Sequence, residues 1–159
     1  MKELSHCFLS KCDRSGAYTK VEWTMFSQIG QTFSGEVLTS DEYERVEDAY
    51  IQAALSFLRE SGLLSMRVAG LKHSRKRSLD FQNGIVLPLE RIGEITRQIL
   101  REEYWCRLEG SDGFLHFGWD YYMYIGVPHL CPIARARATK LGLFVEEFAS
   151  PYVEHEAES

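Results

Sequence analysis

The sequence predicts a single α+β domain in which a mostly antiparallel sheet is covered by helices on one face. Three observations lead to this fold class. Segments with the alternating apolar pattern of strands are interspersed with segments that carry apolar residues at helical spacing. Two β-prone runs are joined by a short Gly-, Ser- and Asp-rich segment, which is typical of an antiparallel hairpin. The 159 residues suffice for one core, which we expect in residues 1–152, followed by an acidic, disordered tail at 153–159.

The expected order of elements is β-α-β-α-β-β-α-β, and its first strand is expected in the apolar segment at residues 21–29. A helix follows, because Thr39 and Glu42 form a capping box that satisfies free backbone N–H groups, and Gly62 supplies a stop. Its apolar positions recur at helical spacing: Tyr43, Val46, Tyr50, Ala53, Phe57 and Leu58. The next strand is expected at residues 64–71.

The second half of the chain contains the same kinds of helix and strand signals. Pro88 suits the first turn of a second helix, whose apolar stripe comprises Leu89, Ile92, Ile95 and Ile99. A strand is expected at residues 104–108. The final unit is a short helix at residues 133–141 after Pro132, a stop at Gly142 and a strand at residues 143–148.

Between Leu115 and Val127 every odd-numbered residue is large and apolar. Because side chains alternate across a strand, this pattern predicts one long strand, the second arm of a hairpin that turns at residues 109–113. A bend is expected near Gly118; a turn at Trp119 and Asp120 is less favoured, because neither residue tolerates positive φ as glycine does. The odd-numbered residues should face the core. The even-numbered ones face the other side of the sheet, and if that side is open they stand on an exposed surface: His116, Asp120, Tyr122 and Tyr124.

The net charge of −5 is unevenly distributed: residues 1–50 hold 5 basic and 9 acidic residues, 51–100 hold 8 and 4, and 101–159 hold 5 and 10. The basic run at 72–77 is interpreted as an exposed loop, since one short run is a weak nucleic-acid signal in an acidic protein.

No stretch approaches the roughly 18 apolar residues of a membrane helix, and no signal-peptide run is seen. We therefore expect a cytoplasmic protein with no membrane or nucleic-acid partner. The cysteines should be reduced thiols: Cys7, Cys12, Cys106 and Cys131.

No recognisable catalytic motif is present. His116 and Asp120 lie four residues apart on one strand face, roughly 13 Å along an unbent strand, which is too far for an acid–base pair unless the strand kinks. A zinc site combining His129 and Cys131 with Cys106 or His116 lacks the usual ligand spacing, and Cys131 can equally cap the following helix. We expect no catalytic residues, no metal and no cofactor.

A binding role suits the even-numbered face better, because tyrosine and tryptophan offer large, rigid contact surfaces with a polar tip. The expected partner-binding residues are His116, Asp120, Tyr122 and Tyr124, with Glu109 and Asp112 at the hairpin tip. The acidic residues should steer a basic partner towards this face.

Three stretches of the C-terminal third carry a family resemblance: WCRLE from Trp105, GFLHFGWDYYMYIG from Gly113 and LFVEEFASPY from Leu143. They resemble small bacterial proteins of the toxin-immunity type. This resemblance implies a non-enzymatic cytoplasmic protein that binds a cognate effector toxin and blocks its active site, but it carries over no binding residues. Two alternatives remain: a regulatory or small-ligand-binding module that uses the aromatic strand face, and a hydrolase that uses His116 and Asp120.

Overall fold

The computed structural model describes residues 4–11, 23–73, 79–118, 121–147 and 149–153. A seven-stranded sheet dominates the fold, in the order β5-β4-β6-β7-β8-β1-β9, and every neighbouring pair is antiparallel. Its strands are β1 (Ser5–Ser10), β4 (Ser65–His73), β5 (Val86–Pro88), β6 (Tyr104–Gly110), β7 (Gly113–Phe117), β8 (Met123–Val127) and β9 (Phe144–Glu147).

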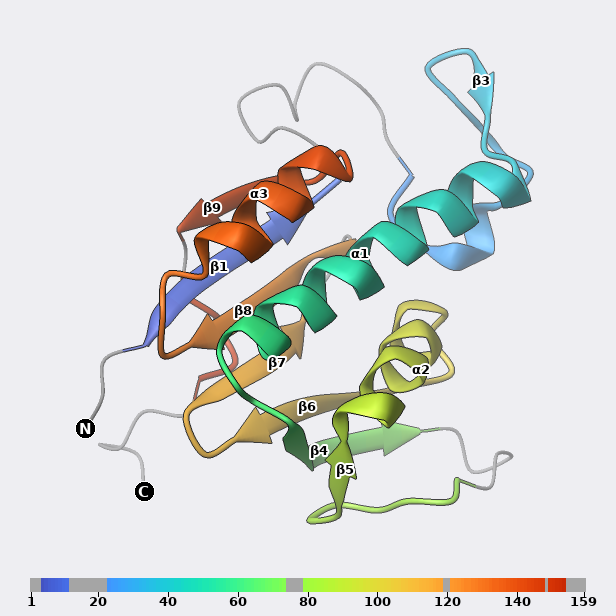
Figure 1. Ribbon diagram of the computed structural model, residues 1–159. Helices are drawn as coiled ribbons and strands as arrows, with labels where there is room; N and C mark the ends of the chain where they lie inside the picture. The colour runs from blue at the N-terminus through green and yellow to red at the C-terminus, as the bar shows by residue number, and fades with distance from the viewer. Residues whose placement is uncertain (1–3, 12–22, 74–78, 119–120, 148, 154–159) are drawn as a thin grey trace.

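Three helices cover one face of this sheet: α1 (Ser40–Glu60), α2 (Leu89–Leu100) and α3 (Pro132–Lys140). Helix α1 lies between the other two (Figure 1). A 3₁₀ turn, η1 (Phe26–Gln28), and a two-stranded ribbon, β2 (Thr32–Phe33) with β3 (Glu36–Val37), precede α1. The predicted α+β class, with an antiparallel sheet and helices on one face, is confirmed.

Helix α1 begins where the capping signal predicted. The Thr39 hydroxyl accepts a hydrogen bond from the Glu42 backbone N–H at 3.1 Å, and Gly62 follows the helix with φ of +75°. The apolar stripe of α1 is buried against the sheet and includes Tyr43, Tyr50 and Phe57. Helices α2 and α3 likewise form close to their predicted positions, and Pro88 occupies the N-cap of α2.

The expected first strand at residues 21–29 is wrong in its described part. Residues 23–29 form a loop with η1, and from this loop Trp23, Phe26 and Ile29 pack against the core. The first strand of the sheet is instead β1, which pairs with both β8 and β9. Residues 21–29 carry the apolar side chains of a strand, but the described ones pack on the core from a loop. Residues 5–10 form a strand because β8 and β9, which are distant in sequence, supply their backbone hydrogen bonds.

The long strand predicted between Leu115 and Val127 is also wrong, because it is two strands. Strands β7 and β8 form a hairpin in which Leu115 pairs with Ile125, and the Gly118 N–H donates to the Tyr122 carbonyl at 2.9 Å. Trp119 and Asp120, where the less favoured turn was placed, lie outside the described residues. Tyr121 supplies the left-handed conformation that the turn needs, with φ of +66°.

The division between odd-numbered and even-numbered residues survives this correction. Because odd-numbered residues of β7 pair with odd-numbered residues of β8, both strands present the same parity to the helices. The described odd-numbered residues all belong to the main core, as predicted: Leu115, Phe117, Tyr121, Met123, Ile125 and Val127.

Other expectations fall partly or wholly on residues that the structure leaves undescribed. Lys72 and His73 extend β4 rather than starting the expected loop, and residues 74–78 lie outside the described ranges. The same holds for residue 148 and for residues 154–159 of the expected tail. Among the described residues, no helix is long and apolar enough to cross a membrane.

Candidate functional site

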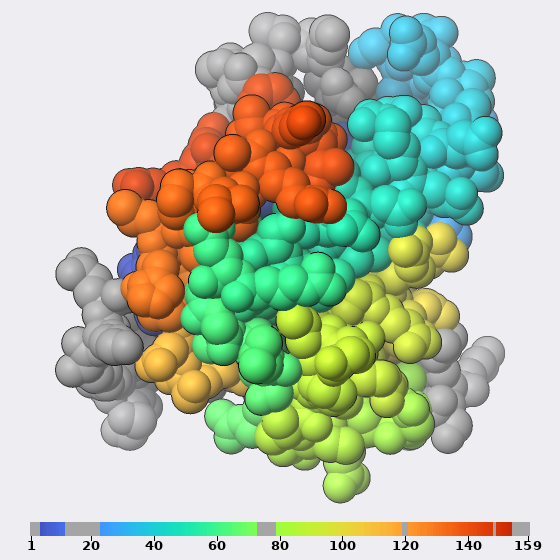
Figure 2. Space-filling model, in the orientation of Figure 1, coloured from blue at the N-terminus to red at the C-terminus, as the bar shows by residue number. Residues whose placement is uncertain are grey.

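The helices pack side by side into a continuous layer over one face of the sheet (Figure 2). We call the opposite face of the sheet the outer face. Its central side chains come from alternate positions of four strands: Phe8, Trp105, Arg107, Glu109, Phe114, His116 and Tyr124. Gly126 in β8 makes room for one of them, because a Cβ at this position would lie 2.1 Å from the Phe114 ring.

The central part of the outer face is not open, because a later segment of the chain covers it. Residues 149–153, which we call the C-terminal strap, cross it and form a second, smaller core with it. Tyr152 is the centre of this contact, with its ring centroid 5.4 Å from that of Trp105 and 6.2 Å from that of Tyr124. The buried residues of the second core are Phe8, Phe114 and Tyr124.

His116 anchors the strap. Its Nδ1 lies 2.8 Å from the Ser150 hydroxyl and its Nε2 lies 2.9 Å from a Glu109 carboxylate oxygen. The Tyr152 backbone N–H donates to the same Ser150 oxygen at 3.1 Å. The Nε2–H tautomer of the imidazole satisfies all these groups: Ser150 donates to Nδ1, and Nε2–H donates to Glu109. Phe114 stacks on the imidazole, with ring centroids 4.2 Å apart.

The order Ser150, His116, Glu109 is that of a nucleophile, a base and an orienting carboxylate. Its setting supports anchoring instead. The His116 side chain is 1% exposed and Ser150 is 6% exposed, so the hydroxyl lies under the strap that carries it. Since the Ser150 oxygen also accepts the Tyr152 N–H, its bonds fix the strap conformation.

The predicted site residues fall into three groups. His116 and Tyr124 are buried beneath the strap, Tyr122 and Glu109 are half-buried, and Asp112 is exposed in the β6–β7 turn. Asp120 lies outside the described residues, so the pair with His116 is not described; the carboxylate that His116 does bind belongs to Glu109.

Sequence reasoning missed Ser150, Tyr152 and Arg107. The Arg107 guanidinium lies 3.7 Å from the Glu109 carboxylate and donates to the Tyr152 carbonyl at 3.5 Å, so it ties the strap to β6. One signal was present: Tyr152 and Val153 place an aromatic and an apolar side chain just before the acidic C-terminal residues, which is typical of a segment that packs.

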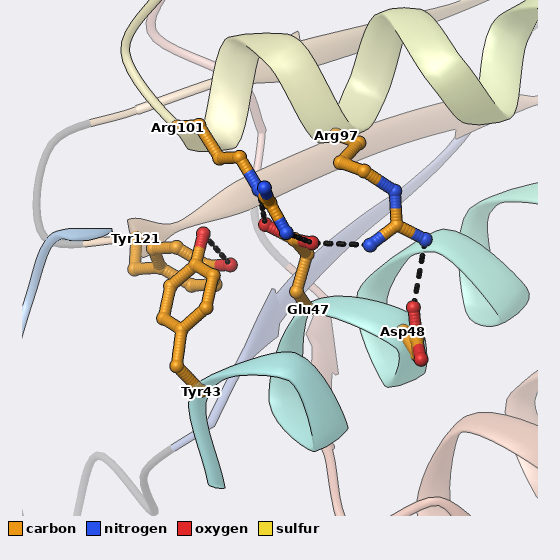
Figure 3. A network of polar contacts seen from close by, with 6 residues as sticks. All are labelled: Tyr43, Glu47, Asp48, Arg97, Arg101 and Tyr121. Atoms are coloured by element: carbon orange, nitrogen blue, oxygen red, sulfur yellow. Dashed lines mark hydrogen bonds and ion pairs between the residues drawn. The ribbon is translucent and has the colours of Figure 1, made fainter. Parts of the chain in front are cut away.

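A second polar network lies on the helical side of the sheet, between α1, α2 and the β7–β8 turn (Figure 3). Glu47 on α1 is 0% exposed and accepts hydrogen bonds from Arg97 and from Arg101, whose Nε lies 2.9 Å away. Arg97 also donates to Asp48 at 2.8 Å. Glu47 breaks the apolar pattern of its helix face, and the two arginines one turn apart on α2 explain how its charge is tolerated.

Two tyrosines adjoin this network. The Tyr121 hydroxyl donates to that of Tyr43 at 3.0 Å, and Trp23 packs on both rings (Figure 3 shows the tyrosines). Burial, together with a hydrogen bond to Glu47, raises the pKa of Tyr43 above its ordinary value. Burial raises the pKa of Tyr121 as well. These contacts hold Tyr121 in its left-handed conformation and make the network a structural one.

The cysteines and histidines considered for zinc do not converge. No group of three or more potential ligands that could hold a metal is found among the described residues. Cys7, Cys106 and Cys131 are buried free thiols, and burial raises the pKa of Cys106 to about 12. Cys131 stands at the N-cap of α3 without a side-chain capping bond; Glu60 accepts from the Ala134 N–H at 2.7 Å instead.

No protein-family model, no curated protein and no solved structure matches this chain.

Proposed function

We propose that this protein is a non-enzymatic binding protein that neutralises a cognate bacterial effector toxin by blocking the toxin's active site. The observation that supports it is the set of partly exposed aromatic side chains on the outer face: Trp105, Tyr122 and Tyr152. Aromatic residues of this kind dominate the binding energy of protein interfaces when they are held in place before the partner arrives.

These rings are held in place by specific contacts. Trp105 donates its indole N–H to the Phe117 carbonyl at 3.0 Å, and Tyr152 is fixed by the strap. Tyr122 packs edge-on against Phe8, with ring centroids 4.8 Å apart. Because the strand backbone and these contacts restrict the rings, little conformational entropy is lost on binding.

The proposed contact residues are Tyr122, Glu109 and Asp112, together with Asp120. In this proposal His116 and Tyr124 support the surface from beneath, since both are buried. The carboxylates favour a basic region on the toxin and increase the rate of association more than the final affinity. The protein acts in the cytoplasm, where such a toxin meets its target.

Co-expression tests this proposal. The probe is the protein encoded by the neighbouring reading frame, produced in a bacterium whose growth it arrests. The wild-type chain should restore growth, and the double variant Tyr122→Ala with Asp112→Lys should fail to restore it. The matched control changes an apolar and an acidic residue on the helical layer, Ile133→Ala with Glu90→Lys, and should still protect. Equal protection by both variants contradicts the proposed surface.

A hydrolase is the second candidate, and one observation favours it: the continuous hydrogen bonds from Ser150 through His116 to Glu109. A fluorophosphonate probe distinguishes the two functions, because it forms a covalent bond with an activated serine. Labelling that disappears in Ser150→Ala supports the hydrolase. An unlabelled wild-type protein that still protects cells supports the binding protein.

A further inference from the structure

The strap leaves the β4 side of the outer face uncovered. Arg67 and Lys72 point from β4 on this side and are exposed, and Val86 on the edge strand β5 is 59% exposed beside Arg67. Neither Arg67 nor Lys72 makes an ion pair within the part of the chain that the structure describes. Exposed cations that no carboxylate of the described residues neutralises are available to bind an anion.

A third cation on this surface, Arg107 of β6, lies against a bulge in β4. The strand register shifts between Ala69 and Lys72, and Gly70 in the bulge has φ of +62°. A Cβ at Gly70 would lie 3.2 Å from Nε of Arg107, so the Arg107 side chain of the neighbouring strand lies against β4. Because Ala69 and Gly70 are small, no large side chain of β4 stands between the cations. We call Arg67, Lys72 and Arg107 the cationic strip.

The charge of the strip opposes that of the chain. The protein carries a net charge of −5, whereas the strip has three cations, and the carboxylate that adjoins it within the described ranges is that of Glu109. That carboxylate already binds His116 at 2.9 Å and lies 3.7 Å from Arg107. Counted over the described residues, the strip therefore has a net positive charge, and Arg67 and Lys72 form no ion pair there.

We propose that the cationic strip binds an extended acidic segment of a partner protein. Carboxylates of this segment contact Arg67 and Lys72, and an apolar side chain of the segment covers Val86. Arginine recognises a carboxylate with two parallel hydrogen bonds, which fixes the position of one carboxylate of the segment at Arg67. The strip lies on the side of the outer face that the strap leaves uncovered, and its binding of an acidic segment does not require that the partner is a toxin.

Trp105 argues for a protein segment over a nucleic acid. Single-stranded nucleic acids bind by stacking bases on open aromatic faces. Lys72 Nζ lies 5.6 Å from the centroid of the Trp105 ring, and Tyr152 packs on the same ring at 5.4 Å, so the ring is already engaged. A nucleic acid also carries a negative charge on every nucleotide, and an acidic protein repels those charges that lie beyond the strip. A peptide can carry its carboxylates only at the positions that face the cations.

A binding assay with full-length protein tests the inference. The probe is a fluorescein-labelled peptide of alternating glutamate and leucine, compared with a single-stranded oligonucleotide of equal charge. The wild-type chain should bind the peptide, and Arg67→Glu with Lys72→Glu should weaken binding at least tenfold. The matched control is Arg59→Glu with Lys140→Glu, which changes the net charge equally at exposed cations of α1 and α3 and should leave binding within twofold.

Three outcomes overturn the inference. Absence of peptide binding to the wild-type chain removes the site. Equal weakening in the two double variants shows attraction by overall charge rather than by the strip. Tighter binding of the oligonucleotide assigns the strip to a nucleic acid. Circular dichroism of each variant confirms that a loss of binding occurs in a folded protein.

Discussion

The imidazole of His116 and the hydroxyl of Ser150 are joined by a 2.8 Å hydrogen bond across 34 residues of sequence. This bond connects the middle of the sheet to the C-terminal strap. It gives the buried imidazole its second partner, and it places Tyr152 over the aromatic side chains of the outer face.

Replacing Ser150 with alanine should release the strap. The substitution leaves Nδ1 of His116 buried without a partner, which costs about 2 kcal/mol of unfolding free energy. Backbone amide exchange of Tyr152, measured by NMR, should accelerate more than that of the β7 amides. The control Ser56→Ala removes a hydroxyl that donates to the Gln52 carbonyl within α1 and should change stability by less than about 0.5 kcal/mol. Unchanged exchange at Tyr152 contradicts the anchoring role.

Glu47 should be far more important to stability than its neighbour Asp48. Glu47→Gln removes the buried charge that faces Arg97 and Arg101, and we expect a loss of about 3 kcal/mol in urea unfolding. Asp48→Asn removes an exposed partner of the same Arg97 and should cost at most about 1 kcal/mol. Similar losses in the two variants refute the buried network as a major source of stability.

Gly126→Ala should destabilise the outer face by about 2 kcal/mol or more, because the new Cβ overlaps the Phe114 ring at 2.1 Å. The ring has no room to move, since it stacks on His116. Shortening Phe114 to alanine in the same chain should remove the overlap. Thermal unfolding of the two single variants and the double variant should then show that the losses are not additive. Additive losses indicate that the two positions do not compete for space.

Alkaline pH should destabilise the protein through Cys106. Burial raises its pKa to about 12 from 9.0, so the folded state keeps the thiol protonated. This stabilisation is complete below pH 9 and is lost as the pH rises towards 12, and the loss reaches roughly 1 kcal/mol by pH 10. Urea unfolding of wild type and Cys106→Val at pH 8 and pH 10 measures it. The variant should lose less stability than wild type over this interval; equal losses exclude the contribution of Cys106.

The helices and the core were predictable because their signals are local. The Thr39 cap needs only Glu42, three residues away. Leu115 and Ile125 face the core whether residues 115–127 form one long strand or a hairpin of two strands. The β7–β8 turn was not predictable, because Tyr121 adopts positive φ only with support from residues distant in sequence, such as Tyr43. Local patterns cannot indicate such support.

The candidate site was only partly predictable for the same reason. The outer face and its residues His116, Tyr122 and Tyr124 follow from alternation along a strand. The strap does not, since nothing in the sequence around Ser150 indicates which surface it will cover. The role of His116 changed accordingly, from a surface residue to a buried anchor with Glu109 as its partner.

The position of β1 has a consequence for synthesis of the protein on the ribosome. This strand emerges before all others of the sheet, yet its two neighbours, β8 and β9, are made only after the other four strands of the sheet. Until then its backbone N–H and C=O groups have no strand to pair with, and the apolar residues Cys7 and Leu9 stay outside a complete core. The sheet therefore closes only after translation has passed residue 147, and β1 stays unpaired while β4 to β7 are made.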